Sequence, residues 1–88
     1  MAIWGADVDQ LRELGNKLKS GASEIESQRN TLTKVLHGTD WRGPDADQFK
    51  GDWDGQHTAL LNQVVEALRQ AGNKATQNAE QQSETSHG

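Results

Sequence analysis

Leucine and isoleucine side chains recur every seven positions near the start of the chain, and this spacing constrains the fold more than any other feature. The series reads Leu11, Leu18, Ile25 and Leu32. A companion series, offset by three or four residues, reads Val8, Gly15, Ala22, Arg29 and Leu36. Both series fall on one stripe of a helix, because three or four residues complete a helical turn. We therefore predict a helix over about residues 7–37, with Asp7 as its N-cap.

A second helical pattern begins at Pro44 and extends over about residues 44–80. Proline is favoured at the first helical position, because its missing N–H would have had no partner there. Several apolar residues recur every eleven positions, which is typical of a nearly straight helix. The predicted stripe comprises Ala46, Phe49, Trp53, Leu60, Val64, Leu68, Ala71, Ala75 and Ala79. The residues expected to flank the two stripes, and to stay partly exposed in a monomer, are Leu14, Val35, Leu61 and Val65.

The connection between the two predicted helices covers only residues 38–43. A connection this short makes the helices antiparallel neighbours, so the predicted fold is an all-α, antiparallel helix-turn-helix hairpin. Gly38 is expected to end the first helix in the left-handed conformation. Trp41 and Gly43 form the turn motif, with Gly43 supplying a backbone free of Cβ clashes and Trp41 covering the end of the hairpin.

One domain, residues 1–82, accounts for the chain, followed by a polar tail at 83–88 that we expect to be flexible. The chain has 88 residues and no cysteine, and hydrophobic residues make up 32% of it. Chains this small usually need a disulfide, a metal or a partner for stability. We therefore expect two hairpins to pair into a four-helix bundle. The residues predicted to pack within and between hairpins are Leu11, Leu14, Leu18, Ile25, Leu32, Phe49, Trp53, Leu60, Leu61, Val64 and Leu68.

Charge and residue spacing argue against several functional classes. Nine basic residues are scattered without a run and the net charge is −4, so we expect no nucleic-acid partner. The three histidines lie far apart, so no metal or other cofactor is expected. Without cysteine or a nucleophile–base pair, no enzymatic activity is expected. The longest unbroken apolar run is three residues, so no integral membrane segment is expected, and the first residues lack the features of a cleaved signal peptide.

The segment from Asp40 to Phe49, with Trp41-Arg42-Gly43 in the turn, closely resembles the WXG-motif family of type VII (ESX) secretion substrates. The resemblance covers nearly the whole chain, and the later stretch from Arg69 to Gly72 is similar to the second helix of such proteins. It implies a small, non-catalytic interaction protein that is exported as a dimer without a cleaved signal peptide. The implied partners are a second copy or a related hairpin, and the type VII secretion ATPase. The implied location is cytoplasmic before export and extracellular after it.

The chain departs from this family in one respect that bears on export. Many members, or their partners, carry a Tyr-x-x-x-Asp/Glu export signal near the end of the second helix, but this chain contains no tyrosine. The corresponding positions run from Ala75 to Ala79, with alanine at both ends. The partner or another part of the tail then carries the signal, or the chain is not exported independently. The alternative function is therefore a cytosolic adaptor or chaperone hairpin that escorts a larger type VII substrate or toxin.

Three further features leave alternatives open. The glycines inside the predicted helices either lower helix stability or let the helices approach closely, as Gly15 would beside Leu18 and Ala22. Trp41 either closes the hairpin by packing or adds to a recognition surface for the secretion machinery. Trp4, which precedes the first helix, either packs against a neighbouring helix end or serves a separate binding role.

Overall fold

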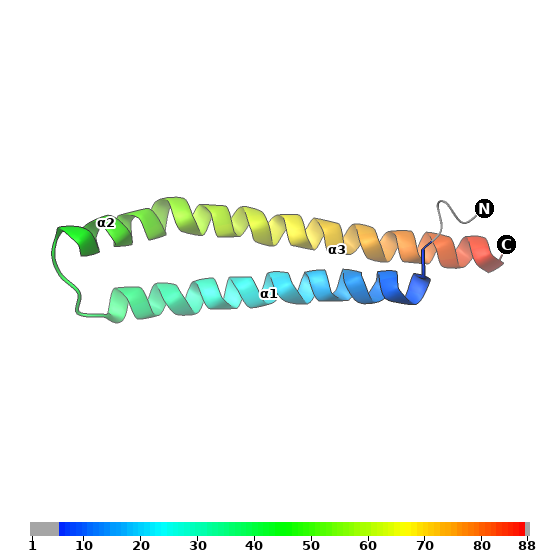
Figure 1. Cartoon of the computed structure of the whole chain (residues 1–88), viewed down its shortest axis with the longest axis horizontal. Helices are drawn as coiled ribbons and strands as arrows, with labels where there is room; N and C mark the ends of the chain where they lie inside the picture. The colour runs from blue at the N-terminus through cyan, green and yellow to red at the C-terminus, as the bar shows by residue number, and fades with distance from the viewer. Residues whose placement is uncertain (1–5, 88) are drawn as a thin grey trace.

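The computed structural model describes residues 6–87 as two long helical arms joined by one turn (Figure 1). The first arm is α1, Val8–Gly38. The second arm runs without a break through α2 (Pro44–Asp52), a π-helical segment (Trp53–His57) and α3 (Thr58–His87). The hairpin measures 65 × 18 × 13 Å, and the part described contains no strand. The predicted all-α antiparallel hairpin is confirmed. The expectation for Trp4 lies outside the described residues.

The two ends of α1 are capped in different ways. Asp7 is its N-cap, as predicted, and its side chain accepts a 3.0 Å hydrogen bond from the backbone N–H of Gln10. The prediction that Gly38 ends the helix in the left-handed conformation is wrong, because Gly43 is the only glycine with a positive φ among the residues described. The next residue, Thr39, ends α1 with extended backbone, and its hydroxyl donates to the Val35 carbonyl at 2.6 Å.

The second arm begins at Pro44 and continues past the predicted end near residue 80. Its last turns lie beside the start of α1, where the Gln82 side chain accepts a 2.9 Å hydrogen bond from the backbone N–H of Ala6. Glutamate and glutamine are good helix formers, so a polar sequence without large apolar residues still sustains these turns. The residues assigned to a separate tail at 83–88 therefore continue α3 as far as His87.

Small residues line the contact between the two arms. The buried positions are Gly15, Ala22, Ala46, Val65, Gly72, Ala75 and Ala79. Gly15 and Gly72 face each other so closely that a Cβ built on Gly72 would lie 2.8 Å from the Gly15 carbonyl oxygen. We call this line of small side chains the seam. No large side chain among the described residues is fully buried in it.

The predicted stripe on the second arm is confirmed at Leu68, Ala75 and Ala79, which are half-buried or buried. It is wrong at Leu60, Val64 and Ala71, where the next residue is the inward one. Val65 is only 3% exposed and Leu61 is half-buried against α1, whereas Leu60 and Val64 are 50% and 45% exposed. The π-helical segment explains the shift, because a π turn inserts one residue relative to a regular α-helix. A stripe extrapolated from Trp53 at α-helical spacing therefore reaches 60 and 64, while the inserted residue moves the inward positions to 61 and 65.

Candidate interaction surface

Backbone geometry at Gly43 and hydrogen bonds around Trp41 shape the turn. Gly43 has φ +118° and ψ 173°, a conformation that side-chain-bearing residues rarely adopt, and it serves as the N-cap of α2. The backbone N–H of Trp41 donates to the Thr39 carbonyl at 2.9 Å, and the Trp41 carbonyl accepts from Lys50 Nζ at 3.1 Å. These bonds hold Trp41 at the end of the hairpin, with 41% of its surface exposed.

Four rings follow one another from the turn into the second arm. Trp41 and Phe49 have centroids 5.8 Å apart, Phe49 and Trp53 stack at 6.4 Å, and Trp53 meets the edge of His57 at 6.5 Å. These separations suit favourable aromatic contacts. The Trp53 indole N–H donates to Thr33 Oγ1 on α1 at 2.9 Å, which anchors the row to the first arm.

A hollow of about 320 Å³ lies beside this row at the turn end of the molecule. We call it the turn groove. Its only polar side chain is that of Thr39, and a second hollow, of about 350 Å³, adjoins it through the shared residue Leu32. The residues lining the turn groove are Leu32, Val35, Leu36, Thr39, Trp41, Phe49 and Trp53.

One side of the hairpin is apolar along both arms. Leu14 and Leu32 lie eighteen residues apart, which is five full helical turns, so they project from α1 in the same direction. Leu60 and Val64 lie one turn apart on α3. We call the surface formed by Leu14, Leu32, Val35, Leu60 and Val64, with Trp41 and Phe49 at its turn end, the apolar face. Each of these seven residues has between 41% and 59% of its surface exposed.

The opposite side of the seam carries polar bridges between the arms. Arg69 of α3 binds Glu26 of α1 with Nη2–Oε1 at 3.0 Å, and Lys19 Nζ lies 3.4 Å from the Thr76 hydroxyl. Glu26 and Lys19 are one residue on from Ile25 and Leu18, so they leave α1 about 100° around the helix from those apolar side chains. The hairpin is therefore amphipathic as a whole, with an apolar face and a polar face.

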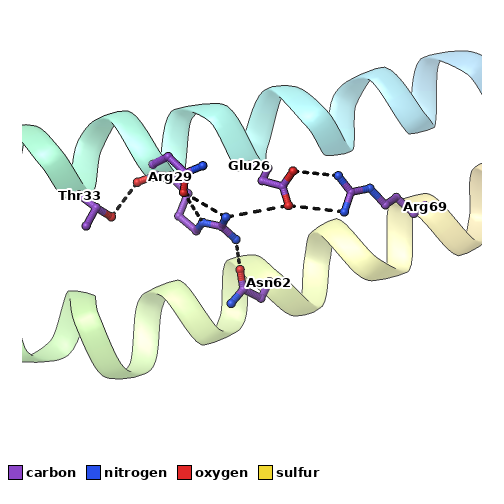
Figure 2. A network of polar contacts seen from close by, with 6 residues as sticks. Glu26, Arg29, Thr33, Asn62 and Arg69 are labelled. Carbon is purple, nitrogen blue, oxygen red and sulfur yellow. Dashed lines mark hydrogen bonds and ion pairs between the residues drawn. The ribbon is translucent and has the colours of Figure 1, made fainter.

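Glu26 is the centre of the polar network (Figure 2). Its carboxylate faces Arg69 across the seam and also lies 3.9 Å from Arg29 on its own helix. The hydrogen bond and charge of Arg69 lower the pKa of Glu26, and Arg29 acts in the same direction. Arg29 also donates to Asn62 of α3 and to Asn30 beside it. Arg29 belongs to the companion series of the α1 stripe, and its guanidinium joins the two arms.

The predicted packing residues fall into two groups. Those half-buried along the seam are Leu11, Leu18, Ile25, Trp53, Leu61 and Leu68, and those exposed on the apolar face are Leu14, Leu32, Phe49, Leu60 and Val64. The export-signal positions are different, since Ala75 is 8% exposed and Ala79 is fully buried. Both alanines face α1, so neither end of this five-residue stretch is available on the surface.

The prediction that Val65 flanks the stripe and stays partly exposed is wrong, and sequence reasoning identified neither the acceptor role of Thr33 nor the partners in the Glu26–Arg69 bridge. Val65 follows once the inserted residue of the π segment is known. The bridge depends on the relative register of two helices, which joins residues 43 positions apart and leaves no local pattern. The one signal in the sequence is that Glu26 and Arg69 each follow an inward-facing residue, Ile25 on the first arm and Leu68 on the second.

Comparisons with protein-family models, with curated proteins and with solved structures found no match to this chain. Within residues 6–87, no helix is long and apolar enough to cross a membrane. The same residues contain no group of three or more histidine, aspartate or glutamate side chains arranged to hold a metal ion.

Proposed function

We propose that this chain is a non-catalytic interaction protein that pairs, through its apolar face, with a second helical hairpin to form a four-helix bundle. The second hairpin is another copy of the chain or a related one. The observation that carries the proposal is the exposure of the apolar face in a molecule whose own seam contains no fully buried large side chain. Contiguous exposed apolar surface of this kind marks interaction sites.

The energetic argument compares what the hairpin buries with what the apolar face still exposes. Fully burying a Val, Leu or Phe side chain contributes about 1.5–3 kcal/mol. The residues of the apolar face are about half exposed, so covering them contributes on the order of 1 kcal/mol each. Seven such residues on each partner offset a large part of the free-energy cost of association.

Mass measurement tests the pairing. We expect the purified chain, alone or with a related hairpin, to sediment as a dimer at micromolar concentration. The double variant Leu60→Ser/Val64→Ser should sediment as a helical monomer, because both changes lie on the apolar face. Gln63→Ser, on the exposed outer side of α3, is the matched control and should remain dimeric. A wild-type chain that is monomeric alone, and that co-purifies from its own cells with no second hairpin, would overturn the proposal.

The resemblance of Trp41-Arg42-Gly43 and its surroundings to the WXG-motif family supports export of this pair through a type VII secretion system. Gly43 in a turn between two long helices agrees with that resemblance. Export should then require the ATPase of the system. Secretion of the tagged chain is compared between a strain with this ATPase and one without it, and equal export from both strains would contradict this route.

The burial of Ala75 and Ala79 favours a second candidate function, a cytosolic adaptor that escorts a larger type VII substrate. These residues occupy the positions of the family's export signal, and both are turned against α1. An adaptor would stay in the cell and co-purify with its client. Recovery of the chain from the culture medium in the absence of any client would exclude this alternative.

A further inference from the structure

The turn groove has the lining of a receptor for one aromatic side chain. Its volume of about 320 Å³ is at the lower end of ligand pockets, and six of its seven lining residues are apolar. The seventh, Thr39, carries a hydroxyl oxygen that donates to the Val35 carbonyl and can still accept a hydrogen bond. An indole ring matches this chemistry, because it buries a large apolar surface and has a single N–H that needs an acceptor.

Trp4 is such a side chain, but it cannot reach the turn groove of its own molecule. The chain described begins with Ala6 beside α1, at the open end of the hairpin opposite the turn (Figure 1). The 31 residues of α1 separate this end from the turn by about 46 Å at 1.5 Å per residue. The few residues between Trp4 and α1 extend by at most about 3.6 Å each. Only a second copy can bring Trp4 to the groove.

Charge and side-chain size both favour the arrangement in which a second copy does so. Five aspartates and only two cations lie between His37 and His57, so a parallel pair would place two acidic turn ends together. An antiparallel pair places each acidic turn end on the other copy's open end. That open end is less acidic than the turn, because Arg12, Lys17, Lys19 and Lys74 nearly balance its acidic residues, which are Asp7, Asp9, Glu13, Glu80 and Glu84.

The large exposed side chains are also concentrated toward the turn. Leu14 is the only exposed large apolar residue in the part of α1 before Leu32. In an antiparallel pair, the turn half of each copy, which carries most of the large exposed side chains, therefore packs against the open half of the other copy, which carries few.

We propose that Trp4 of one copy inserts into the turn groove of a second, antiparallel copy, and that the second copy does the same in return. This inference rests on the pairing proposed above, in its homodimeric form. Two-fold symmetry then gives two identical contacts per dimer. The contact places an aromatic side chain over Trp41 and Phe49 and closes both ends of the bundle.

Dimer affinity tests the contribution of Trp4. We expect Trp4→Ala to weaken dimerisation at least tenfold, as interface tryptophans commonly do, and Trp4→Phe to weaken it less. Trp4 precedes both helical arms, so circular dichroism should show unchanged helix content in each variant. Unchanged affinity of the Trp4→Ala dimer would overturn the inference while leaving the pairing intact, and would assign the groove to another partner. A wild-type chain that is monomeric alone would overturn the inference, whereas the pairing itself is judged by the co-purification described above.

Disulfide trapping tests the geometry independently, because the chain has no cysteine of its own. Ile3→Cys and Thr39→Cys are prepared as separate variants and mixed under oxidising conditions. We expect a cross-linked pair containing one copy of each variant, and much less cross-linking when Ser20→Cys replaces Thr39→Cys. Cross-linking of Ile3→Cys to itself in preference to Thr39→Cys would indicate parallel pairing and would overturn the inference.

Discussion

Replacing Gly15 with alanine tests whether the seam depends on close approach of the two arms. A Cβ at this position would lie 2.6 Å from Thr76 Cγ2, 2.9 Å from the Gly72 carbonyl oxygen and 3.2 Å from the Thr76 backbone nitrogen. Two of these three atoms belong to the backbone, so a rotamer change cannot relieve the overlap. The arms would have to move apart by several tenths of an ångström.

Two opposing effects determine the size of the change. Alanine stabilises a helix by about 1 kcal/mol relative to glycine. Forcing extra volume into a packed contact costs about 1–3 kcal/mol, and separating the arms also loosens the contacts of Ala22 and Ala75 nearby. We expect Gly15→Ala to lower the free energy of unfolding by about 1–2 kcal/mol after the helix gain is included. Gly51→Ala is the matched control, because a Cβ there would meet nothing within 4 Å. That variant should gain up to about 1 kcal/mol.

Urea unfolding followed by far-ultraviolet circular dichroism measures both changes. The slope of the free energy against urea concentration should be the same in both variants, so that the shift of the midpoint reports stability alone. The protein concentration is kept equal throughout, since pairing raises apparent stability by mass action. If Gly15→Ala is as stable as Gly51→Ala, the reasoning about close approach is refuted and the glycines act only through helix propensity.

Three further predictions follow from the turn, the polar network and the first cap. Gly43→Ala should lose about 1–3 kcal/mol in the same assay because of its positive φ, whereas Gly38→Ala, which meets open space, should stay close to wild type. Arg69 lowers the pKa of Glu26, so the stabilisation is complete above the ordinary glutamate pKa of about 4.3 and is lost as pH falls through the lowered value; Glu26→Gln should remove that part of the acid sensitivity in a pH series of melting curves. Asp7→Ala should cost about 1 kcal/mol in urea unfolding, because the N-cap bond to the first turn is lost.

The hairpin itself could be predicted because its determinants are local. The seven-residue spacing from Leu11 to Leu32 identifies one helical stripe without any knowledge of tertiary structure. Asp7 and Pro44 mark the starts of the two arms by chemistry that depends only on neighbouring residues. The short connection then leaves the antiparallel arrangement as the only compact one.

The inward positions directly after the π-helical segment, Leu61 and Val65, could not be predicted, because they depend on a backbone insertion. The residues from Trp53 to His57 carry no pattern that separates a π turn from an α turn. The first two residues of the insertion make tertiary contacts to α1, namely the Trp53 indole bond to Thr33 and the His37 Nε2–Asp54 Oδ1 contact at 2.9 Å. Which side chains face outward was therefore decided by partners on α1, about twenty residues away along the chain.

The narrow seam also explains why no large apolar side chain is fully buried between the arms and why several lie outside the contact. Where Gly15 faces Gly72, the backbones are too close for a leucine between them. The leucines and valines of the apolar face lie to one side of the contact, while Glu26 and Arg69 bridge the other side. Hairpin closure and pairing thus depend on the same interhelical distance. We expect Gly15→Ala to weaken dimerisation as well as to destabilise the hairpin, since moving the arms apart splits the apolar face along its length, whereas Gly51→Ala should leave the dimer affinity unchanged.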